Sequence, residues 1–211
     1  MQLKPYMITR RFTLEEVEEA ATMMRKGGLV AIPTETVYGL ATNAEDAVAV
    51  RMIFDKKDRD YDKPVSMLVT DMKMVEKYAQ NIPEVAYRLA EKYWPGPLTM
   101  VLPDKEALPP MINNDNGTLG FRCPDHPLTL SIIEKAGVPL AAPSANPSGA
   151  EPPRTAQEVL NYFENKIEGI VDGGPCAVGV ESTVLDLTGD EPVILREGGI
   201  PAQELLDFIK G

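Results

Sequence analysis

The sequence predicts an α/β domain built on a mixed, twisted sheet, because stretches of helical and strand pattern are interleaved along the chain. Their order does not follow a strict βαβ rhythm, so the sheet is not expected to be purely parallel. Two apolar runs at 183–187 and 193–195, joined by the turn residues Thr188-Gly189-Asp190, predict a closely connected pair of strands. The chain has 211 residues, of which 44% are hydrophobic, and no linker or repeat divides it, so residues 1–211 are expected to form one domain.

The first helix has the clearest local signals. Thr13-Leu14-Glu15-Glu16 has the form of a capping box, apolar residues then recur on one face, and Gly27-Gly28 ends the pattern. The apolar run at 29–32 follows at once and predicts a buried strand that ends at Pro33. Loops that carry active-site residues often begin where such strands end.

The same patterns continue along the rest of the sequence. Further strands are predicted at 65–69, 98–102, 118–122, 139–142, 169–171, 183–187 and 193–195. Helices are predicted at about 45–56, 72–78, 85–93, 128–136, 156–162 and 203–209. Helices interleaved with strands in this way are expected to flank the sheet.

Composition and charge exclude several classes of protein. A net charge of −11 argues against a protein that lies along a nucleic-acid backbone, because that mode of binding needs a broad basic surface. Residues 1–25 have no secretory pattern, and no apolar run approaches the roughly 20 residues that cross a bilayer, so a cytoplasmic protein is expected. Cys123 and Cys176 form neither a C-x-x-C pair nor a His/Cys cluster, so both are interpreted as buried, reduced thiols and no metal site is predicted.

The common catalytic templates are absent from the sequence. No Walker phosphate loop, dinucleotide fingerprint, G-x-S-x-G elbow or H-E-x-x-H pair is present. His126 is the only histidine, and its place in a turn that opens a helix indicates a polar surface group with a structural role. Trp94, the only tryptophan, lies in a proline-rich turn before a strand and is interpreted as structural support.

Five segments combine polar residues and glycines in ways that suit ligand binding. They are 33–40 (PTETVYGL), 56–64 (KKDRDYDKP), 94–99 (WPGPLT), 143–149 (PSANPSG), and 172–183 with 196–199 (DGGPCAVGVEST and REGG). The 143–149 loop offers hydroxyls, an amide and backbone N–H groups to an anion. Each segment also has an ordinary explanation: a hairpin, a solvated charged loop, a rigid turn, a plain turn, and glycines that end elements. Taken one at a time, the segments leave these alternatives open.

Together, in this order and spacing, the segments resemble the YrdC-like family, the threonylcarbamoyl-adenylate synthases that begin the synthesis of threonylcarbamoyl-adenosine in tRNA. The resemblance runs from about Gly27 to Gly199 and is closest to the short, single-domain form. It implies a twisted, mixed open sheet with flanking helices around a deep concave cavity. The implied reaction converts L-threonine, bicarbonate and ATP into L-threonylcarbamoyl-AMP and pyrophosphate, with Mg²⁺ carried by the nucleotide. A separate tRNA threonylcarbamoyl-transferase complex would receive the product.

The resemblance also implies roles for single residues. Those expected around ATP are Lys57, Arg59, Lys63, Thr118, Ser144, Asn146, Pro152 and Arg196. Those expected around L-threonine are Thr36, Arg122, Ala142 and Ser182. Lys57 and Arg59 are assigned the catalytic role, because cations offset the charge that develops on the α-phosphate and the departing pyrophosphate. Arg122 is suited to a carboxylate, which it can meet through two parallel N–H bonds.

Two positions depart from the family pattern, and two other functions stay open. Asp58 stands where many members have glycine, and Leu68 lies where many have a histidine that contacts threonine. One alternative function is a nucleotide hydrolase that shares the cavity; ATP turnover that requires L-threonine would separate the two. The other is an RNA-binding module, and the acidity of the chain disfavours direct binding of tRNA.

Overall fold

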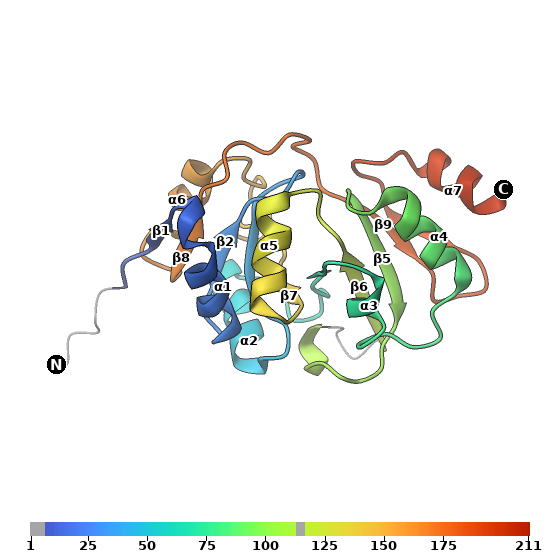
Figure 1. The fold of residues 1–211 in the computed structure, drawn as a ribbon, viewed down its shortest axis with the longest axis horizontal. Coiled ribbons are helices and arrows are strands. Elements are labelled where there is room, and N and C mark those ends of the chain that lie inside the picture. The colour runs from blue at the N-terminus through green and yellow to red at the C-terminus, as the bar shows by residue number, and fades with distance from the viewer. Residues whose placement is uncertain (1–6, 113–116) are drawn as a thin grey trace.

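The computed structural model describes residues 7–112 and 117–211, and the ten strands in these residues form one sheet (Figure 1). The strands are β1 (Arg10–Phe12), β2 (Val30–Ile32), β3 (Gly39–Asn43), β4 (Met67–Leu68), β5 (Leu98–Pro103), β6 (Thr118–Arg122), β7 (Leu140–Ala141), β8 (Gly169–Val171), β9 (Thr183–Asp186) and β10 (Val193–Arg196). Their order across the sheet is β1-β8-β2-β3-β7-β4-β6-β5-β9-β10. The predicted α/β fold is therefore confirmed.

The sheet is mixed, as predicted. Strand pairs β1–β8, β2–β8, β4–β6 and β5–β9 are parallel. Pairs β2–β3, β3–β7, β4–β7, β5–β6 and β9–β10 are antiparallel. The turn at residues 188–190 connects β9 to β10, so the two strands it joins pair with each other.

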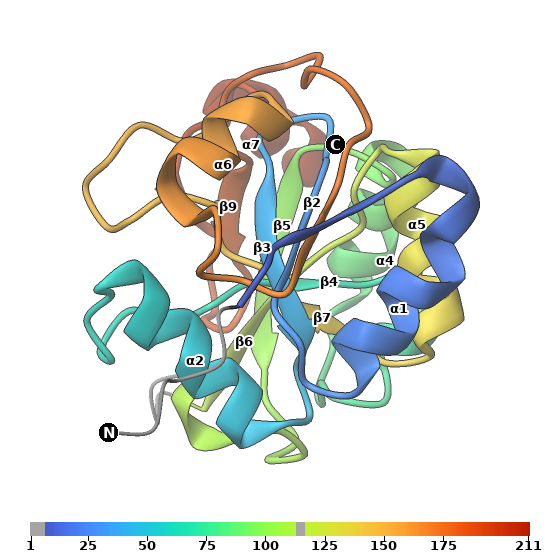
Figure 2. The same cartoon turned by 90° about the vertical axis from the view of Figure 1, so that its left-hand side faces the viewer.

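Helices cover both faces of the sheet. They are α1 (Val17–Arg25), α2 (Ala47–Lys57), α3 (Met72–Val75), α4 (Glu84–Tyr93), α5 (Pro127–Ala136), α6 (Ala156–Phe163) and α7 (Ala202–Lys210), with short 3-10 helices at Leu14–Glu16 and Pro110–Ile112. Figure 2 shows α1 and α5 on one side of the sheet and α2 and α6 on the other. None of the helices in the described residues is long and apolar enough to span a membrane.

The apolar run at 29–32 is explained by burial on both faces of its strand. Val30 and Ile32 pack into the core cluster that contains residues of α1 and α5. Leu29 and Ala31 pack into the larger cluster that contains residues of α2, α4, α6 and α7. Because successive side chains of a strand point to opposite faces, a strand covered on both sides has no polar position.

Two strands were not predicted from the sequence. β1 has the sequence RRF and only its last residue is buried, so it carries no apolar pattern. β3 begins inside the segment 33–40 and pairs antiparallel with β2. The hairpin interpretation of that segment is therefore correct for its end, while residues 33–38 form the loop between the two strands. The prediction that residues 1–211 form one domain stays a prediction.

Three interpretations of single residues can be compared with the structure. Trp94 is structural as predicted, because its Nε1 donates a hydrogen bond of 2.8 Å to the carbonyl of Leu98. Cys123 is buried, but Cys176 is only half-buried, so the expectation of two buried thiols is wrong for Cys176. His126 is half-buried rather than a surface group, because Gly173 lies against it: a Cβ at Gly173 would be 3.2 Å from His126 Cε1.

Candidate active site

A cavity of about 580 Å³ is built on the sheet, and its floor follows the period-two alternation of strand side chains. On β6, Thr118, Gly120 and Arg122 line the cavity, whereas Leu119 and Phe121 enter the core. β5 and β9 alternate in the same way. Polar residues in these apolar strands are therefore placed on one face, where they surround a single space.

The cavity brings together residues from both predicted sets. From the set expected around ATP, it is lined by Arg59, Lys63, Thr118, Ser144 and Arg196. From the set expected around L-threonine, it is lined by Thr36, Arg122, Ala142 and Ser182. These residues come from segments as far apart in the sequence as 36 and 196, so the fold, not local sequence, makes them neighbours.

Arg122 forms a buried ion pair with Glu35. Arg122 Nη2 lies 2.7 Å from Glu35 Oε2, and the two side chains are only 9% and 7% exposed. Burial lowers the pKa of Arg122 below its ordinary value, and Glu35 opposes that shift. Arg122 Nε and Glu35 Oε1 are buried without a hydrogen-bond partner in the part of the chain that the structure describes. Each partner is needed to neutralise the other in this apolar surrounding.

The loop between β2 and β3 is folded around the hydroxyl of Thr34. Thr34 Oγ1 donates to the carbonyl of Val37 (2.6 Å) and accepts the N–H groups of Thr36 and Val37, both at 3.2 Å. Thr36 Oγ1 lies 2.9 Å from Thr34 Oγ1. The N–H groups of Thr36 and Val37 already occupy the two lone pairs of Thr34 Oγ1, so either hydroxyl can be the donor in this pair. The side chain of Thr36 lines the cavity.

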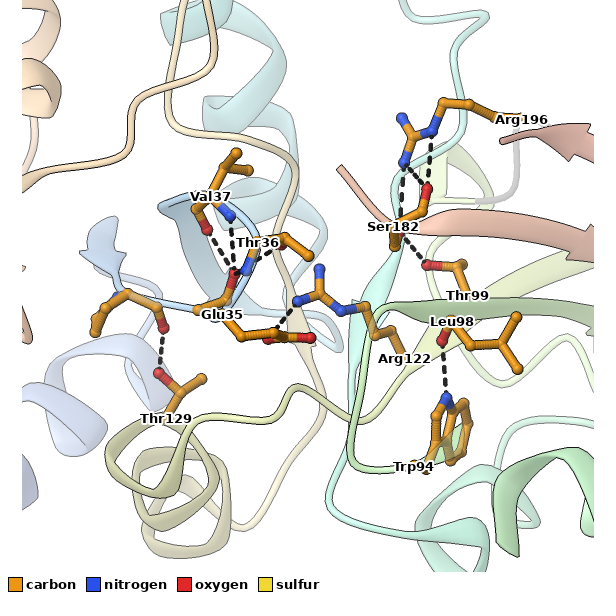
Figure 3. A network of polar contacts seen from close by, with 12 residues as sticks. Glu35, Thr36, Val37, Trp94, Leu98, Thr99, Arg122, Thr129, Ser182 and Arg196 are labelled. Carbon is orange, nitrogen blue, oxygen red and sulfur yellow. Dashed lines mark hydrogen bonds and ion pairs between the residues drawn. The ribbon is translucent and has the colours of Figure 1, made fainter. Parts of the chain in front are cut away.

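Ser182 and Arg196 lie across the cavity from this loop, with Arg122 between the two groups in Figure 3. Arg196 Nε and Nη2 donate to the carbonyl of Ser182 at 3.1 and 3.0 Å. Arg196 Nη1 also lies 3.1 Å from Glu181 Oε1. Two further cations, Arg59 and Lys63, line the same cavity. The cavity therefore offers several positive groups to an anionic ligand.

The 143–149 loop is held from behind by Lys57. The ammonium group of Lys57 donates to the carbonyls of Ser144 and Asn146, and the carbonyl of Lys57 accepts the N–H of Ser148 at 2.7 Å. The side chain of Lys57 is buried, which lowers its pKa to about 7, and the nearby Arg59 adds to that shift. Asn146 Nδ2 donates to the carbonyls of Pro147 and Ala150. Lys57, from behind the loop, and Asn146, within it, thus fix the shape of the loop.

Three predicted site residues do not line the cavity. Lys57 and Asn146 lie behind the wall that Ser144 forms, and Pro152 is half-buried away from it. Lys57 is held away from the cavity because its ammonium group is buried and needs hydrogen-bond partners other than water. The carbonyls of Ser144 and Asn146 are those partners. In this structure Lys57 supports Ser144, which lines the cavity, and its contact with the nucleotide stays a prediction.

Comparison with known proteins identifies the family. Residues 22–198 match the Sua5/YciO/YrdC family, which carries the description "Telomere recombination". The chain belongs to the Sua5/YciO/YrdC family. A family member from Pyrococcus abyssi, threonylcarbamoyl-AMP synthase, is 47% identical over 196 residues, which make up 90% of this chain and 58% of that protein. A putative threonylcarbamoyl-AMP synthase from Methanocaldococcus jannaschii is 35% identical over 90% of this chain and 91% of its own length.

Solved structures of family members have the same fold. Sua5 from P. abyssi in complex with L-threonine superposes with a TM-score of 0.91 at 45% identity, covering 96% of this chain and 60% of that one. YciO from E. coli superposes with a TM-score of 0.82 at 26% identity, covering 90% and 96%. The chain thus spans about three fifths of the length of the P. abyssi protein.

The two departures from the family pattern have different positions. Leu68, at the end of β4, lines the cavity and gives it an apolar wall beside Arg122. Asp58 is exposed and ends α2 in the left-handed conformation, with φ of 49° and ψ of 44°. Glycine adopts this conformation without strain, so the frequent glycine of the family is explained by backbone geometry. The carboxylate of Asp58 points into solvent and not at the cavity.

Replacing Asp58 by glycine is expected to raise the free energy of unfolding by about 1 kcal/mol, because it relieves the left-handed strain and removes a negative charge at a helix C-terminus. Urea unfolding at neutral pH measures the change. Asp58→Asn is the matched control, since it removes only the charge and should recover about half of the gain. A glycine variant less stable than the original protein would contradict this explanation.

Some site residues of this family member were not predicted from its sequence. Glu35 pairs with Arg122, Thr99 contacts Ser182, and Glu181 contacts Arg196. A signal for Glu35 was present, because a carboxylate inside an otherwise uncharged, partly apolar segment is rarely buried unless it is paired. Thr99 could also have been found, since it is polar at a position of an apolar strand that faces away from Leu98 and Met100.

Proposed function

We propose that this chain catalyses the ATP-dependent formation of L-threonylcarbamoyl-AMP from L-threonine and bicarbonate, with release of pyrophosphate. The observation that carries the proposal is one cavity lined by residues suited to both substrates. The activity named for the P. abyssi relative supports it. On this proposal the chain is a nucleotidyltransferase that acts at the start of threonylcarbamoyl-adenosine synthesis in tRNA.

The amino-acid substrate would bind between Thr36 and Ser182. Arg122, at the floor of the cavity, would hold the carboxylate of threonine, because a guanidinium can offer a carboxylate two parallel N–H bonds. The hydroxyls of Thr36 and Ser182 lie on opposite sides of Arg122 and would pair with the polar groups of threonine (Figure 3). A site that pairs buried polar groups in this way rejects analogues that lack them.

The nucleotide would bind along the cationic wall. Arg59, Lys63 and Arg196 would contact its phosphates, with Thr118 and Ser144 donating hydrogen bonds. Mg²⁺ would arrive on the triphosphate and supply further charge neutralisation there. Burial lowers the pKa of Arg59, and Glu181 opposes that shift, so its guanidinium remains a cation beside the phosphates.

The chemistry requires two bonds to form in the same space. The amine of threonine attacks the carbon of bicarbonate and water leaves, which gives a carbamate; a carbamate oxygen then attacks the α-phosphorus and pyrophosphate departs. The residues of this chain would hold the amine, the carbon and the α-phosphate in line and stabilise the developing charge. A separate transferase complex acting on tRNA would take up the adenylate.

The test is incubation of the purified chain with ATP, Mg²⁺, bicarbonate and L-threonine, followed by mass detection of L-threonylcarbamoyl-AMP. Pyrophosphate release should require L-threonine and bicarbonate. Release of inorganic phosphate without threonine would instead support a nucleotide hydrolase. Binding of tRNA that stays tight at about 200 mM salt would support an RNA-binding module.

Arg59→Ala is expected to slow pyrophosphate release about tenfold, because one charge-assisted contact to the phosphates is lost. Lys56→Ala is the matched control: it removes a neighbouring cation that does not line the cavity, and it should leave the rate unchanged. Equal rates for Arg59→Ala and the unchanged protein would remove Arg59 from the proposed phosphate site.

A further inference from the structure

The hydroxyl of Ser182 lies in a small polar network with Thr99 and Arg196 (Figure 3). Ser182 Oγ lies 2.8 Å from Thr99 Oγ1 and 3.3 Å from Arg196 Nη2. Ser182 is 5% exposed and Thr99 only 1%, and both line the cavity. The function proposed above gives no role to Thr99.

Hydrogen bonds of the residues just before Thr99 hold it in place. Trp94 Nε1 donates to the carbonyl of Leu98, and the N–H of Thr183 donates to the carbonyl of Pro97 at 2.9 Å. β5 then runs parallel to β9, with Leu98 opposite Thr183. The strand pairing therefore fixes Thr99 beside Ser182, the residue that directly precedes β9.

Arg196 is held on the other side of Ser182. Its Nε and Nη2 grip the carbonyl of Ser182, and its Nη1 contacts Glu181. Gly198 packs directly against this backbone: a Cβ there would lie 2.2 Å from the carbonyl oxygen of Glu181 and 2.7 Å from that of Ser182. Only glycine fits at this position, which explains the R-x-G spacing.

The hydrogen-bond directions in this network follow from donor and acceptor counts. A guanidinium has no acceptor, so Ser182 Oγ accepts a hydrogen from Arg196. If Ser182 then gave its own hydrogen to Thr99, the hydrogen of buried Thr99 would have no acceptor in the described residues. If Thr99 donates to Ser182, the remaining hydrogen is that of Ser182, whose side chain is the more exposed of the two, at 5% against 1%. Each arrangement leaves one hydrogen without a partner in the described residues, and this costs less where water or a ligand can reach the hydrogen, so the second arrangement is favoured.

We propose that Thr99 and Arg196 together hold the hydroxyl of Ser182 as a hydrogen-bond donor toward the cavity, where it binds an acceptor oxygen of the amino-acid substrate. Thr99 is thus a positioning residue that acts through Ser182. The partner of Ser182 is a carboxylate or hydroxyl oxygen and not an ammonium group, which is itself a donor. This inference rests on the proposed function.

The experiment measures binding of L-threonine by isothermal titration calorimetry to the unchanged protein and to Thr99→Val. The valine keeps the shape but donates no hydrogen, so Ser182 Oγ loses one of the two donors that orient its hydroxyl, and binding should weaken about tenfold. Thr99→Ser keeps the hydroxyl and should bind within about twofold of the unchanged protein. The KM for ATP in pyrophosphate release should not change in any of these variants.

Thr42→Val is the matched control. Thr42 is fully buried on β3, its hydroxyl donates to the carbonyl of Gly28 at 3.0 Å, and it does not line the cavity. This variant loses a buried hydroxyl as Thr99→Val does, so thermal unfolding should show a similar loss of stability for both, with weaker threonine binding only for Thr99→Val. If Thr99→Val does not fold, Thr99→Ala removes the same hydroxyl from a smaller side chain.

The outcomes separate this inference from the proposed function. If the unchanged protein binds no L-threonine, the proposed function is wrong and the inference is lost with it. If the unchanged protein binds L-threonine and Thr99→Val binds it equally well, only the inference is wrong. The inference is also wrong if Thr42→Val weakens threonine binding as much as Thr99→Val does, or if Thr99→Ser binds threonine as weakly as Thr99→Val.

Discussion

Replacing Arg122 by methionine is expected to lower the free energy of unfolding by about 3 to 5 kcal/mol and to abolish binding of L-threonine. The loss of stability comes from Glu35, which stays buried at 7% exposure with no cation beside it. The loss of binding comes from the missing partner of the substrate carboxylate. Urea unfolding and titration calorimetry measure the two effects independently.

The double variant Arg122→Met with Glu35→Gln is the control for this prediction. It removes both charges from the same buried site, so most of the lost stability should return, because an uncharged pair needs no counter-ion. Threonine binding should not return, since the guanidinium is still absent. A single variant as stable as the original protein would show that the ion pair is not needed to keep Glu35 buried. A single variant that still binds threonine would exclude Arg122 as the carboxylate partner.

The order of helices and strands was predictable because local signals carry it. The run at 29–32 is apolar throughout, and its strand is covered on both faces. The capping box at Thr13 and the glycines at 27–28 bracket the first helix, as the structure shows. Short strands such as β4 and β7 were predicted in the right place, but their predicted ranges were too long. A run of apolar residues indicates burial and not how far the strand pairs with its neighbours.

The composition of the cavity was predictable from motifs, while its internal contacts were not. Lys57 contacts residues 87 and 89 positions away, and Arg122 contacts a residue 87 positions away. No local pattern encodes which buried cation faces a carbonyl and which faces a ligand. The segment 56–64 has the sequence pattern of a charged loop throughout. It nevertheless contains one buried cation behind the cavity wall, Lys57, and one cation that lines the cavity, Arg59.

Replacing Lys57 by methionine is expected to slow pyrophosphate release about 100-fold, although Lys57 does not line the cavity. The carbonyls of Ser144 and Asn146 would lose their shared donor, so the 143–149 loop would shift and Ser144 would leave its place in the wall. A displacement of about 1 Å at a positioning residue has effects of this size. Steady-state kinetics with ATP as the varied substrate measure the change.

The pH dependence of stability distinguishes a positioning role for Lys57 from direct contact with the phosphates. Its pKa is lowered from 10.5 to about 7 in the folded protein, so between these pH values the unfolded chain holds a proton that the folded chain has released. Raising the pH through this window therefore favours folding. The free energy of unfolding of the unchanged protein should rise, relative to that of Lys57→Met, by about 1 kcal/mol per pH unit. Below pH 7 the difference in free energy between the two proteins should not change with pH.

Parallel stability curves for the two proteins from pH 7 to 10 would mean that Lys57 keeps its proton when the chain folds. A lysine that stays fully charged is suited to phosphate contact, and the carbonyls it now meets would then be partners that a bound nucleotide displaces. A steeper curve for the unchanged protein would instead show that an amine can hold the loop without its charge. In that case the positive wall of the cavity is supplied by Arg59, Lys63 and Arg196, and Lys57 decides only where Ser144 stands.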